Sequence, residues 1–342
     1  MIRSERRGSR SGFALPAVLA VTGVVTLIFL VAMTALSSLT AEAASARARV
    51  RFIARSMTAE AMMTYMAATE PMAPTGINTG GPRMFDDGIY DPTGGAGELV
   101  RLDGRDYQVD LDGPLLITPQ DQAGLINLAY LQDAGYQRLG ETLGLPERLT
   151  RRLASLYRDY IDQDDLEQPN GAEAEDYDRA GPANRAMRRP DEWLSLLGVR
   201  GAVRSSAWRR LRPYLAMDPT SPNENVNTAP SEAMQILYGA TPAQVEAAIR
   251  AREQKPFLSF PEFAAATGLP DTSGESFYTF PSGRILLTIA DSRSAWVYRS
   301  RLTLTPSGVE RPVWIDQTEL KEAPGRAVAD LSDAVRLPYA PR

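Results

Sequence analysis

The chain has 342 residues, of which 23% are charged and 44% hydrophobic, an ordinary balance for a folded protein. It contains no histidine and no cysteine, which excludes Ser-His-Asp and Cys-His catalysis, disulfides and cysteine-containing zinc sites. A metal would therefore be held by oxygen ligands, which favours Ca²⁺ or Mg²⁺. The net charge is −5, and because residues 1–12 contribute +3, the remainder carries −8, unlike a nucleic-acid-binding protein.

The amino terminus combines a basic leader, residues 1–12, with an apolar segment, residues 13–36, that contains no charged side chain. As a helix this segment would be about 36 Å long, enough to cross a hydrocarbon core of about 30 Å. The arginines of the leader place the amino terminus in the cytoplasm and the rest of the chain across the inner membrane, in the periplasm. An ordinary signal peptide is the alternative, but its apolar core would be shorter.

Gly12 and Phe13 stand at the boundary between these two segments. A short basic leader, a glycine and an aromatic residue that opens an apolar helix resemble the type IV prepilin class. The resemblance implies that a prepilin peptidase cuts between Gly12 and Phe13 and that the new amino group of Phe13 is open to methylation. Most members have Glu as the fifth mature residue, where this chain has Ala17. That Glu neutralises the terminal amine of a neighbouring subunit within the membrane, so a subunit without it suits the leading end of a fibre.

Residues 37–70 continue the helix beyond the membrane. They are rich in Ala, Arg, Met and Glu, which favour helices, and Gly and Pro appear only from Pro71 onward. The pattern predicts one long amino-terminal helix whose second part is periplasmic. A simple membrane anchor with a helical stalk, which needs no fibre, is the alternative.

The remainder predicts a head of the α+β class. Residues 71–117 comprise a loop to residue 98 and then two strands, and residues 284–342 comprise three strands and a tail, with Pro306-Ser307-Gly308 as a hairpin turn. Between them, residues 118–283 are mostly helical in pattern. We therefore predict a pilin-like fold, in which the long amino-terminal helix packs on a small antiparallel sheet that is interrupted by a large helical insertion domain.

A weak internal repeat divides the insertion into two units that resemble SAM or helix-hairpin-helix domains. Ile126-Asn127-Leu128-Ala129 recurs as Val226-Asn227-Thr228-Ala229, and a short helix opened by Pro190 recurs as one opened by Pro261. Each Asn can cap a helix or close a turn. Chance similarity between two small helical units is the alternative.

The first unit contains the most acidic part of the chain, with nine carboxylates between Asp159 and Asp178. Such a cluster repels itself unless it is solvated or neutralised, and Ca²⁺, which takes six to eight oxygen ligands, suits it. The spacing is not that of an EF-hand, and a solvated acidic loop is the alternative. The candidate calcium ligands are Asp162, Asp164, Asp165, Glu173 and Asp176.

The same region resembles the helical domain of general secretion pathway protein K, the large minor pseudopilin of type II secretion systems. The resemblance is carried by four motifs in order: residues 159–165 (DYIDQDD), 171–173 (GAE), 191–194 (DEWL) and 225–230 (NVNTAP). Tyr160 and Asn170 depart from the usual family residues without removing a candidate ligand. The resemblance implies calcium in the head, a position at the pseudopilus tip and assembly with the pseudopilins called I and J. Its further partners would be the major pseudopilin, the prepilin peptidase and the inner-membrane assembly platform.

We therefore predict a single-pass minor pseudopilin that caps and initiates the pseudopilus during protein export, with no enzymatic activity and no nucleic-acid partner. One alternative is a minor type IV pilin. Another is a competence-type DNA-binding protein, because residues 227–258 resemble one helix-hairpin-helix unit; its turn, however, has Pro242 where an N–H donor would be useful. A glycoside hydrolase using Asp164 and Glu173 is a third, but no aromatic-lined cleft is evident near them.

Overall fold

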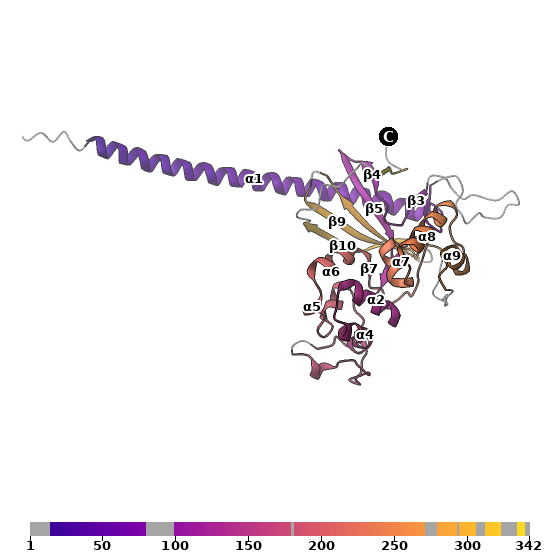
Figure 1. The fold of residues 1–342 in the computed structure, drawn as a ribbon. Coiled ribbons are helices and arrows are strands. Elements are labelled where there is room, and N and C mark those ends of the chain that lie inside the picture. The colour runs from indigo at the N-terminus through magenta and orange to yellow at the C-terminus, as the bar shows by residue number, and fades with distance from the viewer. Residues whose placement is uncertain are drawn as a thin grey trace, which may run out of the picture. The chain divides into compact units, whose positions relative to one another are not determined.

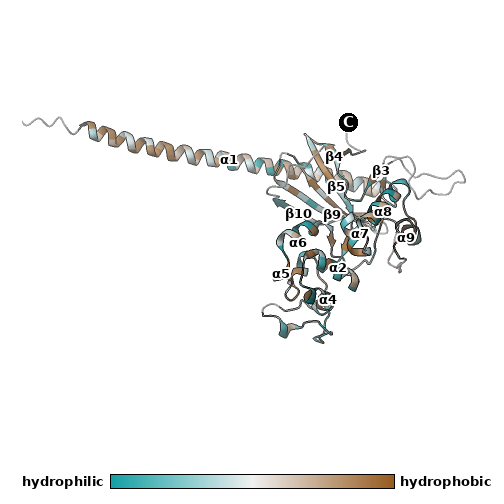
Figure 2. Ribbon diagram, viewed as in Figure 1, coloured by the Kyte–Doolittle hydropathy of each residue, from teal (hydrophilic) through white to brown (hydrophobic). Residues whose placement is uncertain are grey.

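The computed structural model describes residues 14–79, 99–178, 181–270, 279–292, 294–305, 312–322 and 334–338. The chain divides into two compact units, Met1–Ala54 and Arg55–Arg342. The described part of the first unit is the beginning of helix α1 (Ala14–Thr69), which is brown with apolar side chains along most of this stretch in Figure 2. Its length and hydropathy are sufficient to cross a membrane, and the predicted long amino-terminal helix is confirmed.

In the second unit, the end of α1 packs on a sheet. Ala59, Met63 and Met66 are buried at helical spacing. Two polar contacts fix this packing. The Arg55 guanidinium donates to the carbonyl oxygens of Leu111 and Gly113 and forms an ion pair with Asp291. The buried Glu60 carboxylate accepts a hydrogen bond from Tyr298 Oη at 3.2 Å. Arg55 and Glu60 therefore set how the end of α1 lies on the strands.

The sheet has six strands in the order β10-β9-β8-β5-β4-β11 (Figure 1). Buried and partly exposed residues alternate along β8, as expected for a strand with one face on the core. All pairs are antiparallel except β11 with β4, which is parallel, so the predicted purely antiparallel sheet is corrected at that edge. The strands are β4 (Tyr107–Asp110), β5 (Pro114–Asp121), β8 (Arg284–Ala290), β9 (Trp296–Leu304), β10 (Val313–Glu322) and β11 (Val335–Arg336).

A second, three-stranded sheet corrects the loop predicted for residues 71–98. Strands β1 (Met72–Ala73) and β2 (Gly76–Asn78) form a hairpin within that segment, and β2 pairs with β3 (Leu99–Arg101). A Cβ on Gly76 would lie 2.1 Å from the carbonyl oxygen of Val100, so this close strand pairing requires glycine. Residues 99–117 thus supply three strands rather than two. The predicted turn at Pro306-Ser307-Gly308 lies outside the described residues.

The helical insertion joins β5 to β8. Because β5 continues to Asp121, the insertion begins there and not at the predicted residue 118. Its first unit is closed by a two-stranded parallel pair, β6 (Ile126–Asn127) and β7 (Leu215–Ala216). Its helices are η1 (Gln122–Gly124), α2 (Asp133–Leu143), α3 (Glu147–Thr150), α4 (Leu153–Ile161), η2 (Ala174–Asp176), η3 (Pro190–Ser195), α5 (Val199–Ala202), α6 (Ser205–Leu211) and η4 (Arg212–Tyr214).

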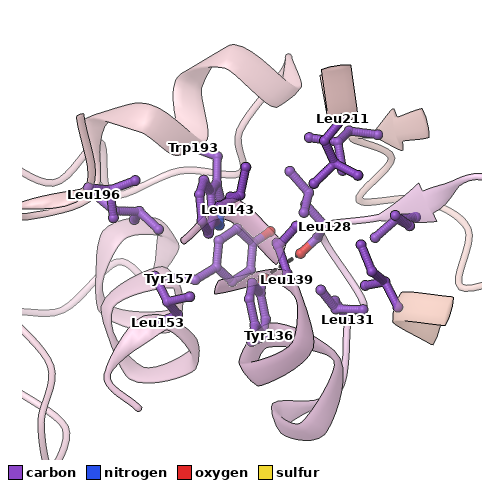
Figure 3. Packing of buried hydrophobic residues seen from close by; sticks show 14 of the residues in the cluster. Leu128, Leu131, Tyr136, Leu139, Leu143, Leu153, Tyr157, Trp193, Leu196 and Leu211 are labelled. Carbon is purple, nitrogen blue, oxygen red and sulfur yellow. Dashed lines mark hydrogen bonds between the residues drawn. The ribbon is translucent and has the colours of Figure 1, made fainter. Parts of the chain in front are cut away.

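In the first unit of the insertion, five aromatic side chains lie within a mostly aliphatic core. The rings of Trp193 and Trp208 stack with their centroids 6.0 Å apart. Tyr136 packs on Tyr157, and its hydroxyl donates to the carbonyl oxygen of Leu128 (Figure 3). Buried Tyr hydroxyls need a partner of this kind. The core therefore fixes α2 and α4, and with them the acidic segment that follows α4.

The second unit of the helical insertion comprises α7 (Ser231–Tyr238), α8 (Pro242–Gln254) and α9 (Phe260–Thr267) around a separate core. The two copies of the predicted repeat share a hydrogen-bonding pattern. The Asn127 carboxamide bonds both the N–H and the carbonyl oxygen of Asp218, at 3.0 and 2.9 Å. The Asn227 carboxamide bonds both groups of Phe257, each at 2.9 Å. Neither Asn caps a helix. Asn127 closes a turn instead, the other outcome that the prediction allowed, because its side-chain oxygen accepts the N–H of Ala129 at 3.2 Å.

Candidate metal centre

Three carboxylates meet at the end of α4. Asp159 lies in the last turn of the helix, Asp162 follows it, and Glu173 returns from the far side of the acidic loop. One oxygen from each carboxylate lies within 4.8 Å of the others. Asp159 is fully buried and Glu173 is 5% exposed. The loop thus holds three negative groups at close range in a site that is largely shielded from water.

The loop is folded around Asp159. This carboxylate accepts backbone hydrogen bonds from Gln168 at 3.2 Å and Ala172 at 2.9 Å. A Cβ on Gly171 would lie 1.6 Å from Asp159 Oδ2, so the turn requires glycine at this position. The Arg152 guanidinium donates to the carbonyl oxygens of Asn170 and Gly171 and fixes the same turn from outside. Asp159 therefore has a structural role that is independent of any ligand.

The other two carboxylates lack such partners. Asp162 Oδ1 and both Glu173 oxygens are buried without a hydrogen-bond partner among the described residues. Burial raises the pKa of both carboxyl groups, and the neighbouring acidic groups add to this effect. Unsatisfied buried oxygens are unfavourable unless something pairs with them. Hard oxygen donors with negative charge are the ligand set that Ca²⁺ takes, so these residues fit a bound calcium ion.

An amide oxygen lies at the same end of α4. The backbone N–H groups of Ala183 and Asn184 both donate to the carbonyl oxygen of Tyr160. The side-chain Oδ1 of Asn184 is buried and has no partner in the described part of the chain. Amide oxygens also coordinate Ca²⁺, so Asn184 is a further candidate ligand.

The structure thus brings together two of the five predicted ligands, Asp162 and Glu173. Asp164, Asp165 and Asp176 are exposed and lie outside the group of three carboxylates. Asp164 accepts from the N–H of Leu166, and Asp176 accepts from the N–H of Glu173. Asp159 and Asn184 were not predicted. The spacing of Asp159 and Asp162, which places them one helical turn apart, is a signal that could have identified the former.

The raised pKa values predict how stability depends on pH when no divalent ion is present. The folded state binds protons at Asp162 and Glu173 more readily than the unfolded chain, so lowering the pH from about 7 to about 5 in a chelator should stabilise the protein. Stability should fall as the pH rises through these raised values. Urea unfolding at a series of pH values measures the slope of the free energy of unfolding against pH. Asp162→Asn/Glu173→Gln should reduce this slope, leaving the part due to Asp121 and Glu224, whose pKa values burial also raises. An unchanged slope would contradict the assignment.

The other sequence-predicted site lies mostly beyond the described residues. Gly12 and Phe13 are outside them, so the cleavage site stays a prediction. Ala17 lies in α1, in a stretch with exposed apolar side chains. The DNA-binding alternative is not favoured. At the turn between α7 and α8, the N–H groups of Thr241 and Gln244 are paired in a capping box, and Pro242 has none to offer a phosphate.

Comparison with known proteins identifies the same family that the acidic motifs resemble. Residues 121–220 match the family model described as type II secretion system (T2SS), protein K. A protein K from Pseudomonas aeruginosa is 27% identical over 191 residues, covering 53% of this chain and 57% of the relative. One from Klebsiella pneumoniae is 27% identical over 156 residues, covering 42% and 48%. The chain thus spans about half the length of the curated relatives it matches.

A solved structure supports the fold. A chain in the crystal structure of the GspK-GspI-GspJ complex from enterotoxigenic Escherichia coli superposes with a TM-score of 0.54 at 16% identity, covering 82% of this chain and 99% of that one. This likeness confirms the predicted α+β fold class. The sequence matches bear out the resemblance to the protein K family, whose model matches residues 121–220 of this chain.

Proposed function

We propose that this chain, as a carrier of the protein K domain, is a minor pseudopilin that caps and initiates the pseudopilus of a type II secretion system. The observation that carries the proposal is the uncharged, membrane-crossing part of α1, with Ala17 in place of the usual Glu. A subunit within a fibre pairs that Glu with the amine of the subunit ahead, because a buried charge without a partner is unfavourable. A chain without it needs no subunit ahead.

The size of the head supports the same position. The insertion between Asp121 and Arg284 adds two helical units, each with its own core, to the six-stranded sheet. Regularly stacked subunits leave little room for such additions between neighbours, whereas the fibre end has no such limit. The role is structural, and we expect no enzymatic activity.

The partners follow from the family. Because the structurally similar chain belongs to a GspK-GspI-GspJ complex, we expect this chain to assemble with the pseudopilins I and J, and below them with the major pseudopilin. The exposed apolar side chains of α1 suit association with partner helices in the membrane. The inner-membrane assembly platform would then extrude the fibre and export protein across the outer membrane.

Calcium would serve the head as a structural ion. Asp162 and Glu173 would hold it, with Asp159 and Asn184 as neighbouring oxygen donors. The ion neutralises the acidic loop and stabilises the folded head because it binds only the folded arrangement. Without it, three carboxylates repel one another at the end of α4.

Processing by a prepilin peptidase tests the proposal at its first step. Amino-terminal sequencing of the mature protein from inner membranes should give Phe13 as the first residue. Gly12→Val should leave the precursor uncut and abolish secretion, whereas Gly8→Val, also in the leader, should be processed normally. A mature chain that begins near residue 45 would show ordinary secretion and contradict the proposal.

A further inference from the structure

A groove lies between the first helical unit and the face of the six-stranded sheet opposite the end of α1. Tyr298 on β9 contacts Glu60 of α1, so the alternating Arg299 and Arg301 point to the other face. There, the sheet and the segments around η3 and η4 enclose a cavity of about 120 Å³. A neighbouring hollow of about 560 Å³ shares Arg188 and Arg301 with this cavity, so the two form one elongated groove.

The groove is rich in arginine although the chain is acidic overall. Among the described residues, the cavity has a single lining carboxylate, Glu319, and the neighbouring hollow has Asp218. Arg185 and Arg284 line the hollow. The cavity itself is lined by the guanidinium groups of Arg188, Arg189, Arg212, Arg299 and Arg301. Positive charge is therefore concentrated on this face of the sheet.

Internal ion pairs account for only part of this charge. Arg212 pairs with Asp191 at 2.9 Å and Arg301 with Asp316 at 2.8 Å. Arg284 pairs with Asp218, and Arg185 pairs with Glu192. Two guanidinium groups differ from these. In the described part of the chain, the side chains of Arg188 and Arg189 form no ion pair, although the backbone N–H of Arg188 donates to the Glu192 carboxylate. They are the arginines best placed to bind an external anion.

The groove also has apolar surface between its charges. Pro213 and Met217 from the helical unit and Leu286 from β8 line it together with the arginines. Burial, and then the charge of Arg301, lower the pKa of the Arg284 guanidinium, as expected where like charges face one another. An incoming carboxylate would relieve that repulsion. The presence of both apolar and cationic side chains along an open groove suits a peptide better than a small anion.

We infer that this groove binds an extended acidic peptide segment of a partner protein. Guanidinium groups bind carboxylates bidentately, and their charge complements such a segment. The apolar side chains that line the groove favour a peptide over a polyphosphate backbone, which has nothing to pack against them. The groove uses no residue of the membrane-crossing helix, so this inference and the proposed fibre-tip function can fail separately.

The test measures peptide binding by the full chain in detergent micelles. The probe is a fluorescein-labelled peptide of alternating Glu and Ser, and its anisotropy reports binding. Binding should be saturable and should weaken as salt is added. Arg188→Gln/Arg189→Gln should weaken the affinity about tenfold or more, as loss of charge pairs in an interface does. The matched control, Arg200→Gln/Arg204→Gln, changes two exposed arginines outside the groove and should bind like the parent.

Three results would overturn the inference. The first is equal binding of a peptide with Gln in place of Glu. The second is an unchanged affinity in the double variant, or in both single variants if the double variant melts at a lower temperature than the parent. The third is that single-stranded DNA or phosphatidylglycerol vesicles bind through the same two arginines more tightly than the peptide, which would assign the groove to another class of ligand.

Discussion

Removing calcium should lower the melting temperature of the protein by about 5–10 °C, the shift that corresponds to a loss of roughly 3 kcal/mol in a domain of this size. The reason lies in the carboxylates at the end of α4. Asp162 Oδ1 and both Glu173 oxygens are buried and unpaired in the described structure, and a bound cation would satisfy all three without protonation. Thermal unfolding of the full chain in detergent, with calcium and then with a chelator, measures the shift.

Two variants separate a specific site from a general effect of acidic charge. Asp162→Asn/Glu173→Gln removes the charges of the unpaired oxygens and should melt at the same temperature with and without calcium. Glu175→Gln changes an exposed carboxylate in the same loop and should keep the full calcium response. A melting temperature of the parent that does not respond to chelation would contradict the metal assignment.

Replacing Arg55 should destabilise the head by about 3–5 kcal/mol, the usual effect of removing one partner from a buried ion pair. The side chains of Arg55 and Asp291 are 12% and 4% exposed. The same guanidinium also bonds carbonyl oxygens at the turn between β4 and β5. Arg55→Met keeps the aliphatic stem but loses every one of these hydrogen bonds. Urea unfolding of the full chain measures the difference.

The matched control for Arg55 is an exposed ion pair. Arg151 bonds Glu147 one helical turn away, and its side chain is 73% exposed. Such pairs contribute little, so Arg151→Met should change the free energy of unfolding by less than about 0.5 kcal/mol. Similar stabilities of the two variants would show that Arg55 does not fix the end of α1 on the sheet. Because the proposed fibre would hold the head through that helix, we also expect Arg55→Met to reduce secretion.

Local patterns explain which parts of the fold could be predicted. The apolar run and the helix formers behind it predict α1, and the alternating segments predict β8, β9 and β10, because each pattern repeats within one element. Three short strands could not be predicted this way. Strands β1 and β2 are two and three residues long, and β11 is two, so their existence depends on pairing with distant strands.

The sequence predicts where the candidate site lies but not which residues form it. Clustered carboxylates locate the acidic loop and include Glu173 among the candidate ligands. The inward-facing group depends instead on the turn around Asp159, which only Gly171 allows. That contact is a close approach between residues twelve positions apart, and no periodicity encodes it. Likewise, the arginine groove gathers residues from β5, β7, β8, β9 and β10 and from η1, η3 and η4, which only the tertiary fold brings together.

The central claim is that this chain occupies the tip of a pseudopilus, and labelling it in isolated fibres tests that claim most directly. A gold-labelled antibody against the head, viewed by electron microscopy, should mark one end of each pseudopilus and nowhere along its length. Label distributed along the length of the fibre would contradict the account. So would fibres that form normally in cells that lack this chain.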